Sequence, residues 1–152
     1  MSTTLANDIR LSRRYRFSAS HRLYSDDLSE AENRAIFGKC ANPYGHGHDY
    51  VLDVRVTGPL DPDTGRVVDL QTLDALVREA VLEPFEHSNL NVDIAEFGSL
   101  VPTTENLALV IERRLARKWD SRFAEAPLEH VRLDRIRIEE TKRNIFEVSS
   151  RT

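Results

Sequence analysis

The only cysteine of the chain and two of its five histidines lie within nine residues, from Cys40 to His48. His46 and His48 are separated by one residue, and the segment that follows them, Tyr50 to Thr57, alternates side chains as a β-strand does. If the strand includes both histidines, its two-residue period places their imidazoles on one face, where they can bind the same ion. The sequence therefore predicts a metal site in this segment.

A third histidine, His21, ends another alternating segment, which begins at Arg14. Its odd-numbered residues include Tyr15, Phe17 and Ala19, and His21 shares their face. Considered alone, His21 is best interpreted as a packed core histidine. Together with His46 and His48 it forms a set of three imidazoles, which is typical of catalytic zinc and leaves a fourth position for water or substrate.

Two interpretations of Cys40 remain open. As a fourth ligand, the thiolate would close a tetrahedral zinc site that only stabilises the fold. As an unligated thiol near a metal, a histidine or a positive charge, it would ionise more readily and could act as a general base. Pro43 follows Cys40 closely and suits a loop that carries the thiol away from the metal.

Other candidates lie further along the chain. The polar pair Glu86 and His87 follows a helical segment and fits either a surface pair or a functional one. Glu140 shares the face of a predicted strand with apolar residues, and a buried carboxylate there needs donors, such as the adjacent N–H groups of a heterocycle. Four arginines around the first strand could bind phosphates or form a solvated basic edge: Arg13, Arg14, Arg16 and Arg22.

Composition limits the classes of function. A chain of 152 residues with 40% hydrophobic content predicts one domain, here expected over residues 9–150 with a flexible segment 1–8. The net charge of −4 and the lack of a large basic block indicate no nucleic-acid partner. One cysteine excludes an intramolecular disulfide, and no apolar run is long enough for a membrane helix, so we expect a cytoplasmic protein without membrane attachment.

The elements that must position these residues follow a simple order. After the two strands, apolar residues recur at helical spacing from Val68 to Pro84 and again from Leu107 to Trp119. Two further strands are predicted near residues 131–140 and 145–149, with a bulge or a late strand start near Asp134, where the apolar parity changes. This order predicts an α+β fold, a four-stranded antiparallel sheet (ββααββ) with two helices on one face, whose open edges favour oligomerisation.

Taken together, these residues resemble the 6-pyruvoyltetrahydropterin synthase family, which also contains the bacterial 6-carboxytetrahydropterin synthases. The resemblance covers nearly everything from Ser12 to Val148 and is carried by Phe17 to Tyr24, Gly38 to Cys40 with Asn42-Pro43, Gly45 to His48, Glu86-His87 with Asn89-Leu90, Thr103 to Asn106, and Glu140-Thr141. Five residues separate Cys40 from His46. This spacing resembles the pyruvoyl-forming branch, because the carboxy-forming branch usually has three residues there.

The resemblance implies a role for each matching residue. His21, His46 and His48 would bind zinc, Cys40 would remove a side-chain proton, and His87, oriented by Glu86, would relay protons. Glu140 would anchor the pterin, Thr103 and Thr104 would add ring contacts, and Arg13 and Arg22 would receive the triphosphate. The family usually has aspartate at the position of Glu86, and the added methylene affects a geometry in which displacements of about 1 Å matter for catalysis.

The implied activity is that of a zinc-dependent lyase of tetrahydrobiopterin biosynthesis. It would act on 7,8-dihydroneopterin triphosphate and release triphosphate, in homo-oligomers of the family's tunnelling fold, trimers stacked into hexamers with active sites at subunit boundaries. One alternative is a 6-carboxytetrahydropterin synthase of the queuosine and deazapurine pathway. The other is a non-catalytic zinc- or pterin-binding module in which Cys40 is a ligand.

Overall fold

The computed structural model describes residues 7–124 and 130–150 of the chain. Of the segment 1–8, expected to be flexible, only Asn7 and Asp8 are described. The carboxylate of Asp8 accepts a hydrogen bond from Arg132 Nη2 at 3.0 Å. This side-chain contact connects the start of the first strand to the strand that begins at Arg132, although a third strand lies between the two in the sheet.

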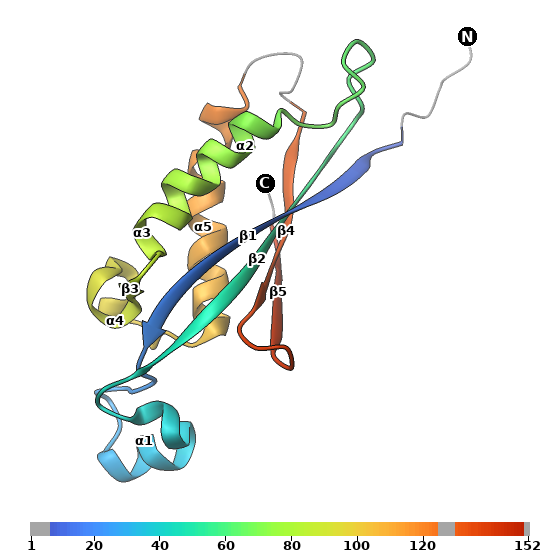
Figure 1. Ribbon diagram of the computed structural model, residues 1–152. Helices are drawn as coiled ribbons and strands as arrows, with labels where there is room; N and C mark the ends of the chain where they lie inside the picture. Colours follow the sequence, from blue (N-terminus) through green and yellow to red (C-terminus); the bar gives the residue numbers. More distant parts are fainter. Residues whose placement is uncertain (1–6, 125–129, 151–152) are drawn as a thin grey trace.

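Five strands form one sheet in the order β3-β1-β2-β4-β5 (Figure 1). The four longer strands pair with one another in antiparallel fashion: β1 (Ile9–His21), β2 (His46–Gly58), β4 (Arg132–Glu139) and β5 (Ile145–Ser149). The prediction of a purely antiparallel four-stranded sheet is wrong in one respect, since β3 (Ser88–Asn89) pairs with β1 in parallel. A strand of two residues has no alternation that a sequence pattern could reveal.

β1 also begins earlier than the sequence predicts. The ladder with β2 continues to the pair Ile9 and Gly58, so β1 begins five residues before Arg14. Backbone pairing with an equally long partner holds this segment, although its own side chains are mostly exposed. Of the two alternatives predicted near Asp134, the structure shows the bulge rather than a late strand start. Val56 pairs with Leu133 and Arg55 with Arg135, which leaves Asp134 as the extra residue.

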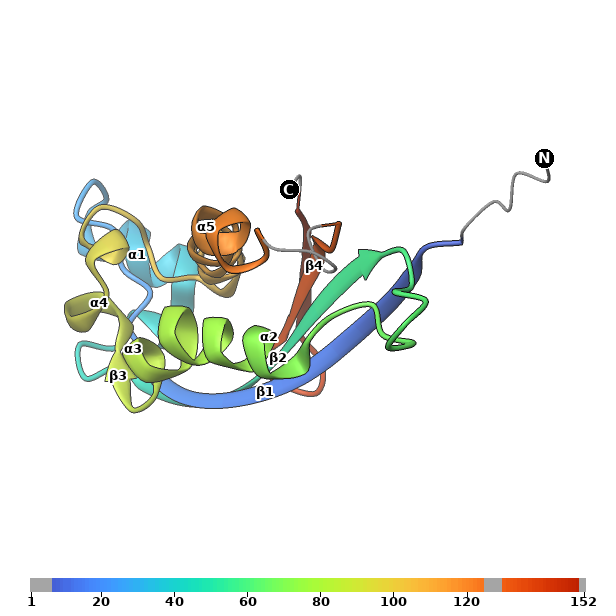
Figure 2. The same ribbon diagram turned by 90° about the horizontal axis from the view of Figure 1, so that it is seen from above.

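The long helices cover one face of the sheet, as predicted (Figure 2). The first consists of α2 (Leu70–Val77), a π-helical turn η2 (Arg78–Leu82) and α3 (Glu83–Phe85), and the second is α5 (Thr104–Arg122). The first helix continues through Pro84, which has no N–H to donate to the carbonyl of Ala80. Arg114 Nη1 donates to that carbonyl at 3.4 Å instead.

None of the helices in the described ranges has the length and apolar character needed to cross a bilayer.

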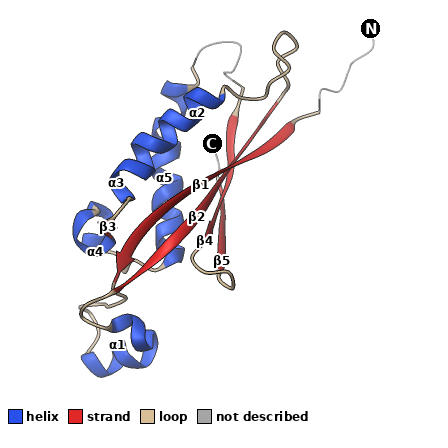
Figure 3. Ribbon diagram, in the orientation of Figure 1, coloured by secondary structure: helices blue, strands red, loops and turns tan. Residues whose placement is uncertain are grey.

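Short helical segments surround the end of the sheet where β1 finishes. The segment α1 (Glu30–Phe37) leads into the 3-10 turn η1 (Gly38–Ala41), and both lie beyond the ends of β1 and β2, apart from the two long helices (Figure 3). Ser29 caps the start of α1 and forms a capping box with Glu32. On the other side, α4 (Leu90–Asp93) and the 3-10 turn η3 (Ala95–Gly98) follow β3.

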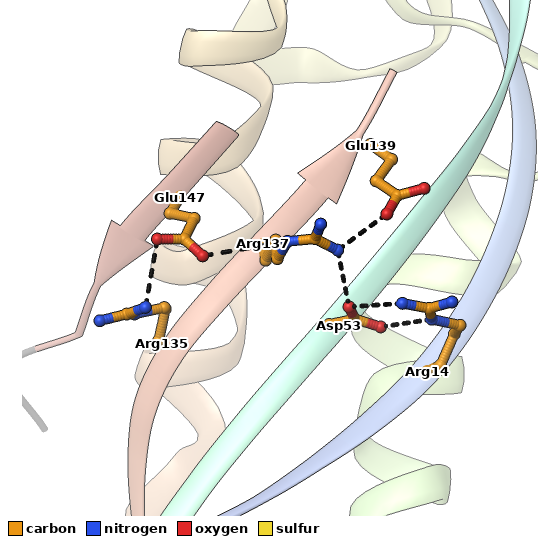
Figure 4. A network of polar contacts seen from close by, with 6 residues as sticks. All are labelled: Arg14, Asp53, Arg135, Arg137, Glu139 and Glu147. Atoms are coloured by element: carbon orange, nitrogen blue, oxygen red, sulfur yellow. Dashed lines mark hydrogen bonds and ion pairs between the residues drawn. The ribbon is translucent and has the colours of Figure 1, made fainter. Parts of the chain in front are cut away.

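The side chains of β1 and β2 divide between two faces. Phe17, Tyr50, Leu52 and Val54 are buried against the helices, and they form one core with residues of α2, α5 and β4. The other face carries a network of charged side chains from all four long strands (Figure 4): Arg14, Asp53, Arg135, Arg137, Glu139 and Glu147. The same alternation that builds the core therefore decides which histidines face the helices.

Asp53 is the centre of this charged network, and its side chain is 14% exposed. It accepts hydrogen bonds from Arg14 at 2.9 and 3.1 Å and from Arg137 at 3.2 Å. The pKa of Asp53 lies below its usual value, mainly because of the hydrogen bonds from Arg14 and also because of the contact with Arg137. Its contribution to stability is therefore present above about pH 4 and is lost as the pH falls through the lowered pKa.

We expect Asp53→Asn to lower the free energy of unfolding by about 1 kcal/mol at pH 7, because it removes the charge shared by two arginines. The difference between variant and parent should shrink as the pH falls below about 4. Denaturant titrations between pH 3 and pH 7 measure both effects. Asp120→Asn on the exposed side of α5 is the matched control and should change little. A constant difference across this pH range would contradict the assignment.

Candidate metal and substrate site

The three predicted histidines meet at one point on the helix-covered face. Their register follows directly from the sheet, in which His21 pairs with His46 and Ala19 pairs with His48. One ring nitrogen from each histidine lies within 4.8 Å of the others, and the Nε2 atoms of His21 and His46 are 3.0 Å apart. Tetrahedral zinc with imidazole ligands requires nitrogen atoms about 3.3 Å apart. The cluster can therefore bind a metal ion with little movement.

Contacts behind His21 orient its ring. Its Nδ1 lies 2.8 Å from the carbonyl oxygen of Pro102, and an Nδ1–H donor there leaves the Nε2 lone pair free for a metal. The next residue is held by Asn91, whose side chain accepts from Arg22 N–H at 2.7 Å and donates to Arg22 O at 2.9 Å. The end of β1 is therefore held by one contact to the His21 ring and two contacts to the Arg22 backbone.

The chemistry of the cluster fits a cation. Burial is the largest cause that lowers the pKa of both His21 and His48, so both rings favour the neutral form that binds metals. His48 Nε2 is buried and has no hydrogen-bond partner among the described residues. A buried nitrogen without a partner is costly in a protein interior, and a metal ion would satisfy it.

Cys40 lies near this cluster in sequence but is not part of it. Within residues 7–124 and 130–150, the group of possible metal ligands consists of the three histidines, and the Cys40 sulfur is not among them. The residue sits in η1, partly exposed as a free thiol, and its carbonyl accepts from Leu23 N–H at 2.8 Å. This arrangement does not support the alternative of a closed site with a thiolate ligand.

A buried polar group lies beside the histidines at the start of α5. Thr104 is buried, and its hydroxyl donates a short hydrogen bond to Glu140 Oε2, while Thr103 caps the helix by accepting from Asn106 N–H. Glu139 pairs with Val51, so Glu140 follows beside Tyr50 on the inner face, as the parity predicted. Burial and then the charge of Glu140 raise the pKa of Tyr50, so its hydroxyl keeps its proton at neutral pH.

His87 lies outside this inner group, at the edge of the sheet. Its side chain is 82% exposed and its Nε2 lies 3.0 Å from Glu86 Oε1, which also accepts from Ser18 N–H at 3.2 Å. The backbone of His87 has a φ of 56°, a left-handed value that is rare outside glycine, and its N–H donates to Ser18 O at 2.6 Å. It lines a hollow with Ser18 and Asp49 of the outer face, and His48 of the histidine cluster lines the same hollow.

The two arginines expected to receive phosphates lie in different places. Arg22 follows His21 directly, donates to Ala41 O at 2.9 Å, and stacks over the ring of Tyr24 at 3.9 Å. It lines a cavity that also contains Arg34 and Lys39. Arg13 instead makes two hydrogen bonds to Asp74 of α2, at 2.7 and 2.8 Å, eight residues before His21 along the strand. The structure does not bring Arg13 to the histidines.

Three contributors to the site were missed from the sequence. Pro102 acts through its backbone carbonyl, Asn91 acts as a clamp on β1, and Tyr50 lies beneath His48 with ring centroids 5.6 Å apart. The first two contacts join residues 81 and 69 positions apart, and no local pattern signals them. Tyr50 could have been found, because it continues the face of His46 and His48 along β2.

Comparison with known proteins identifies the family. A family model described as 6-pyruvoyl tetrahydropterin synthase matches residues 10–151. The 6-pyruvoyl tetrahydrobiopterin synthases of Homo sapiens and Pongo abelii are each 44% identical over 135 residues, covering 89% of this chain and 87% of theirs. The solved structure of Caenorhabditis elegans 6-pyruvoyl tetrahydropterin synthase matches with a TM-score of 0.83 and 38% identity, covering 95% of this chain and 96% of that one. On this sequence and structural similarity, the chain belongs to the 6-pyruvoyl tetrahydropterin synthase family.

Proposed function

We propose that the chain is a zinc-dependent lyase that converts 7,8-dihydroneopterin triphosphate to 6-pyruvoyltetrahydropterin and releases triphosphate. The observation that carries the proposal is the inward cluster of His21, His46 and His48 beside the buried pair of Thr104 and Glu140, in a chain of this family. The histidines, through a bound metal ion, suit the hydroxyl groups of the substrate side chain, and the Glu140 carboxylate suits the pterin ring. The product would enter tetrahydrobiopterin biosynthesis.

Zinc is the metal that this donor set favours. Three neutral imidazoles with no carboxylate or thiolate in the group match the ligands of catalytic zinc sites. Bound zinc would act as a Lewis acid toward the hydroxyl groups of the substrate side chain. The protein would keep His21 in the correct orientation through the Pro102 carbonyl, so that its Nε2 faces the ion.

Glu140 is proposed to hold the pterin ring. A carboxylate with one oxygen occupied by Thr104 can accept adjacent N–H groups of a heterocycle at the other. Thr103 would support this contact by capping α5 and thereby fixing the position of Thr104. Arg22, with Arg34 and Lys39 in the same cavity, supplies the positive charge that a triphosphate needs.

Cys40 and His87 are proposed to move protons. The partly exposed Cys40 thiol, outside the metal group, would act as the base that removes a proton from the substrate side chain. His87, paired with Glu86, would return protons, and Glu86 is itself held by Ser18 N–H. The carboxylate therefore orients the imidazole despite being one methylene longer than the aspartate usual in the family.

The positions of Cys40 and His87 favour a site shared between subunits. The Cys40 carbonyl accepts from Leu23 N–H, beyond the end of β1, whereas His87 N–H donates to Ser18 O within β1, so the two residues contact this segment five positions apart. In the described residues, β1 pairs with β3 only at Ala19 and Ser20, and β5 ends the sheet, so both edges can accept another copy. We therefore propose a homo-oligomer, a hexamer of stacked trimers, in which Cys40 of one subunit works with His87 of another.

The metal proposal predicts about one zinc ion per chain, bound by the histidine cluster. His48→Ala should lose most of this zinc, because two imidazoles and water bind the ion far more weakly. His87→Ala is the matched control and should keep its zinc, since its ring lies outside the cluster. Elemental analysis of dialysed proteins measures the content. Zinc loss in Cys40→Ala would favour the non-catalytic module instead.

The product distinguishes the pyruvoyl lyase from the carboxy-forming alternative. Purified protein incubated with 7,8-dihydroneopterin triphosphate should yield 6-pyruvoyltetrahydropterin, identified by mass, and Cys40→Ala should reduce turnover by about 100-fold or more. Formation of the carboxylated pterin with acetaldehyde would reject the proposed reaction. The five-residue spacing between Cys40 and His46 is the sequence feature that favours the pyruvoyl product.

A shared site predicts complementation between two inactive variants. Cys40→Ala and His87→Ala, co-expressed with different tags and purified as mixed oligomers, should recover about a quarter of the parental activity, because random mixing leaves that fraction of sites with both residues. The activity of each variant alone is the control. Mixed oligomers that stay as inactive as the single variants would show that both residues act within one subunit.

A further inference from the structure

The hydroxyl of Tyr50 is a buried polar group that the proposed mechanism does not use. Tyr50 has 0% exposure, and its hydroxyl has no hydrogen-bond partner among the described residues. Buried hydroxyl groups are nearly always paired, because leaving one unpaired costs free energy. Phenylalanine would fill the same space, since the Tyr50 ring stacks on Phe17 with centroids 5.0 Å apart. The hydroxyl therefore needs an explanation other than packing.

The hydroxyl lies among the groups that would contact the ligand. The Tyr50 ring is 5.6 Å from the ring of His48 on one side. On the other side Glu140 follows the Val51–Glu139 pair, directly across from Tyr50, and Thr104 reaches down from α5 to Glu140. The Thr104 side chain lies close to the Tyr50 hydroxyl and the Glu140 charge acts on it, although the hydroxyl makes no regular hydrogen bond with either. Tyr50 thus lies between the metal end and the carboxylate end of the site.

We propose that Tyr50 is a positioning residue for Glu140, whose hydroxyl donates to Thr104 Oγ1 when a pterin occupies the site. The three groups then form a chain in which Tyr50 donates to Thr104, Thr104 donates to Glu140 Oε2, and the ligand N–H groups are accepted by the remaining oxygen. This inference rests on the proposed function, because it assumes that Glu140 binds the ring.

The direction of each hydrogen bond supports this chain. The Thr104 proton is already committed to Glu140, so the Thr104 oxygen has free lone pairs and can only accept from a further donor. Tyr50 is that donor, and no other polar group of the described residues satisfies its hydroxyl. A small shift of Thr104 toward Tyr50 on ligand binding would pair the hydroxyl and fix the carboxylate in one orientation.

The test removes single hydroxyl groups from β1 and β2. Tyr50→Phe should weaken binding of neopterin about three- to ten-fold, with zinc content unchanged and a melting temperature equal to or above the parent, because an unpaired hydroxyl is lost. Neopterin lacks the phosphates, so binding does not depend on the arginines, and fluorescence titration measures it. Tyr15→Phe is the matched control: its hydroxyl donates to Asp74 at 2.7 Å, so this variant should melt lower and bind neopterin normally.

A double-mutant cycle separates positioning from an unrelated effect. If Tyr50 acts through Thr104, the variant with both Tyr50→Phe and Thr104→Val should bind neopterin no more weakly than Thr104→Val alone. Additive losses, or unchanged affinity in Tyr50→Phe, would overturn the role of Tyr50 while leaving the proposed function in place. If the parent protein with zinc binds no neopterin, both proposals fail together.

Discussion

The antiparallel register between β1 and β2 is the constraint on which the site depends. It pairs His21 with His46 and Ala19 with His48, and a slip of one residue in either strand would turn that strand's histidines to the opposite face. Gly45 helps to fix this register, because its φ of 69° starts β2 in a conformation that suits glycine. A Cβ atom at this position would also lie 2.8 Å from the His21 carbonyl oxygen. No such demand applies to Gly47, where a Cβ atom would make an ordinary contact.

The start of α5 connects the two ends of the site. The carbonyl of Pro102 orients the imidazole of His21, Thr103 caps the helix, and Thr104 holds the Glu140 carboxylate. Three successive residues thus set the ring orientation, the helix start and the carboxylate position. A displacement of this turn would move the proposed metal ligand and the proposed ring anchor together, which keeps their separation constant.

The sequence predicts the parts of this site that depend on local periodicity. Alternation along β1 and β2 was sufficient to place all three histidines on one face, and alternation along β4 placed Glu140 there too. The parity change near Asp134 indicated the irregularity at which the bulge lies. Alternation does not reveal β3, which has two residues, or the Asn91 clamp and Pro102 contact, which join distant segments. Nor does it show that Arg13 is engaged by Asp74, because that contact depends on how α2 packs across β1.

The residues of the proposed site form two groups, one held inside the fold by several contacts and one exposed at the edge of the sheet. The histidines and Glu140 are held by the sheet, by α5 and by hydrogen bonds, whereas His87 has a left-handed backbone and an exposed ring. A non-glycine residue in that conformation costs on the order of 1 kcal/mol or more, and it persists only where neighbouring contacts impose it. Here the Ser18 backbone imposes it, through its carbonyl to His87 N–H and its N–H to Glu86.

Such strain has a physical use if the exposed ring serves a neighbouring copy. The backbone bond to β1 holds His87 at the edge of the sheet, where its exposed ring lines a hollow together with His48. A second copy that pairs with this edge would receive the ring in a fixed orientation, with Glu86 already in place to hold it. The ordering would then be complete before association, so forming the shared site would require little further loss of conformational freedom.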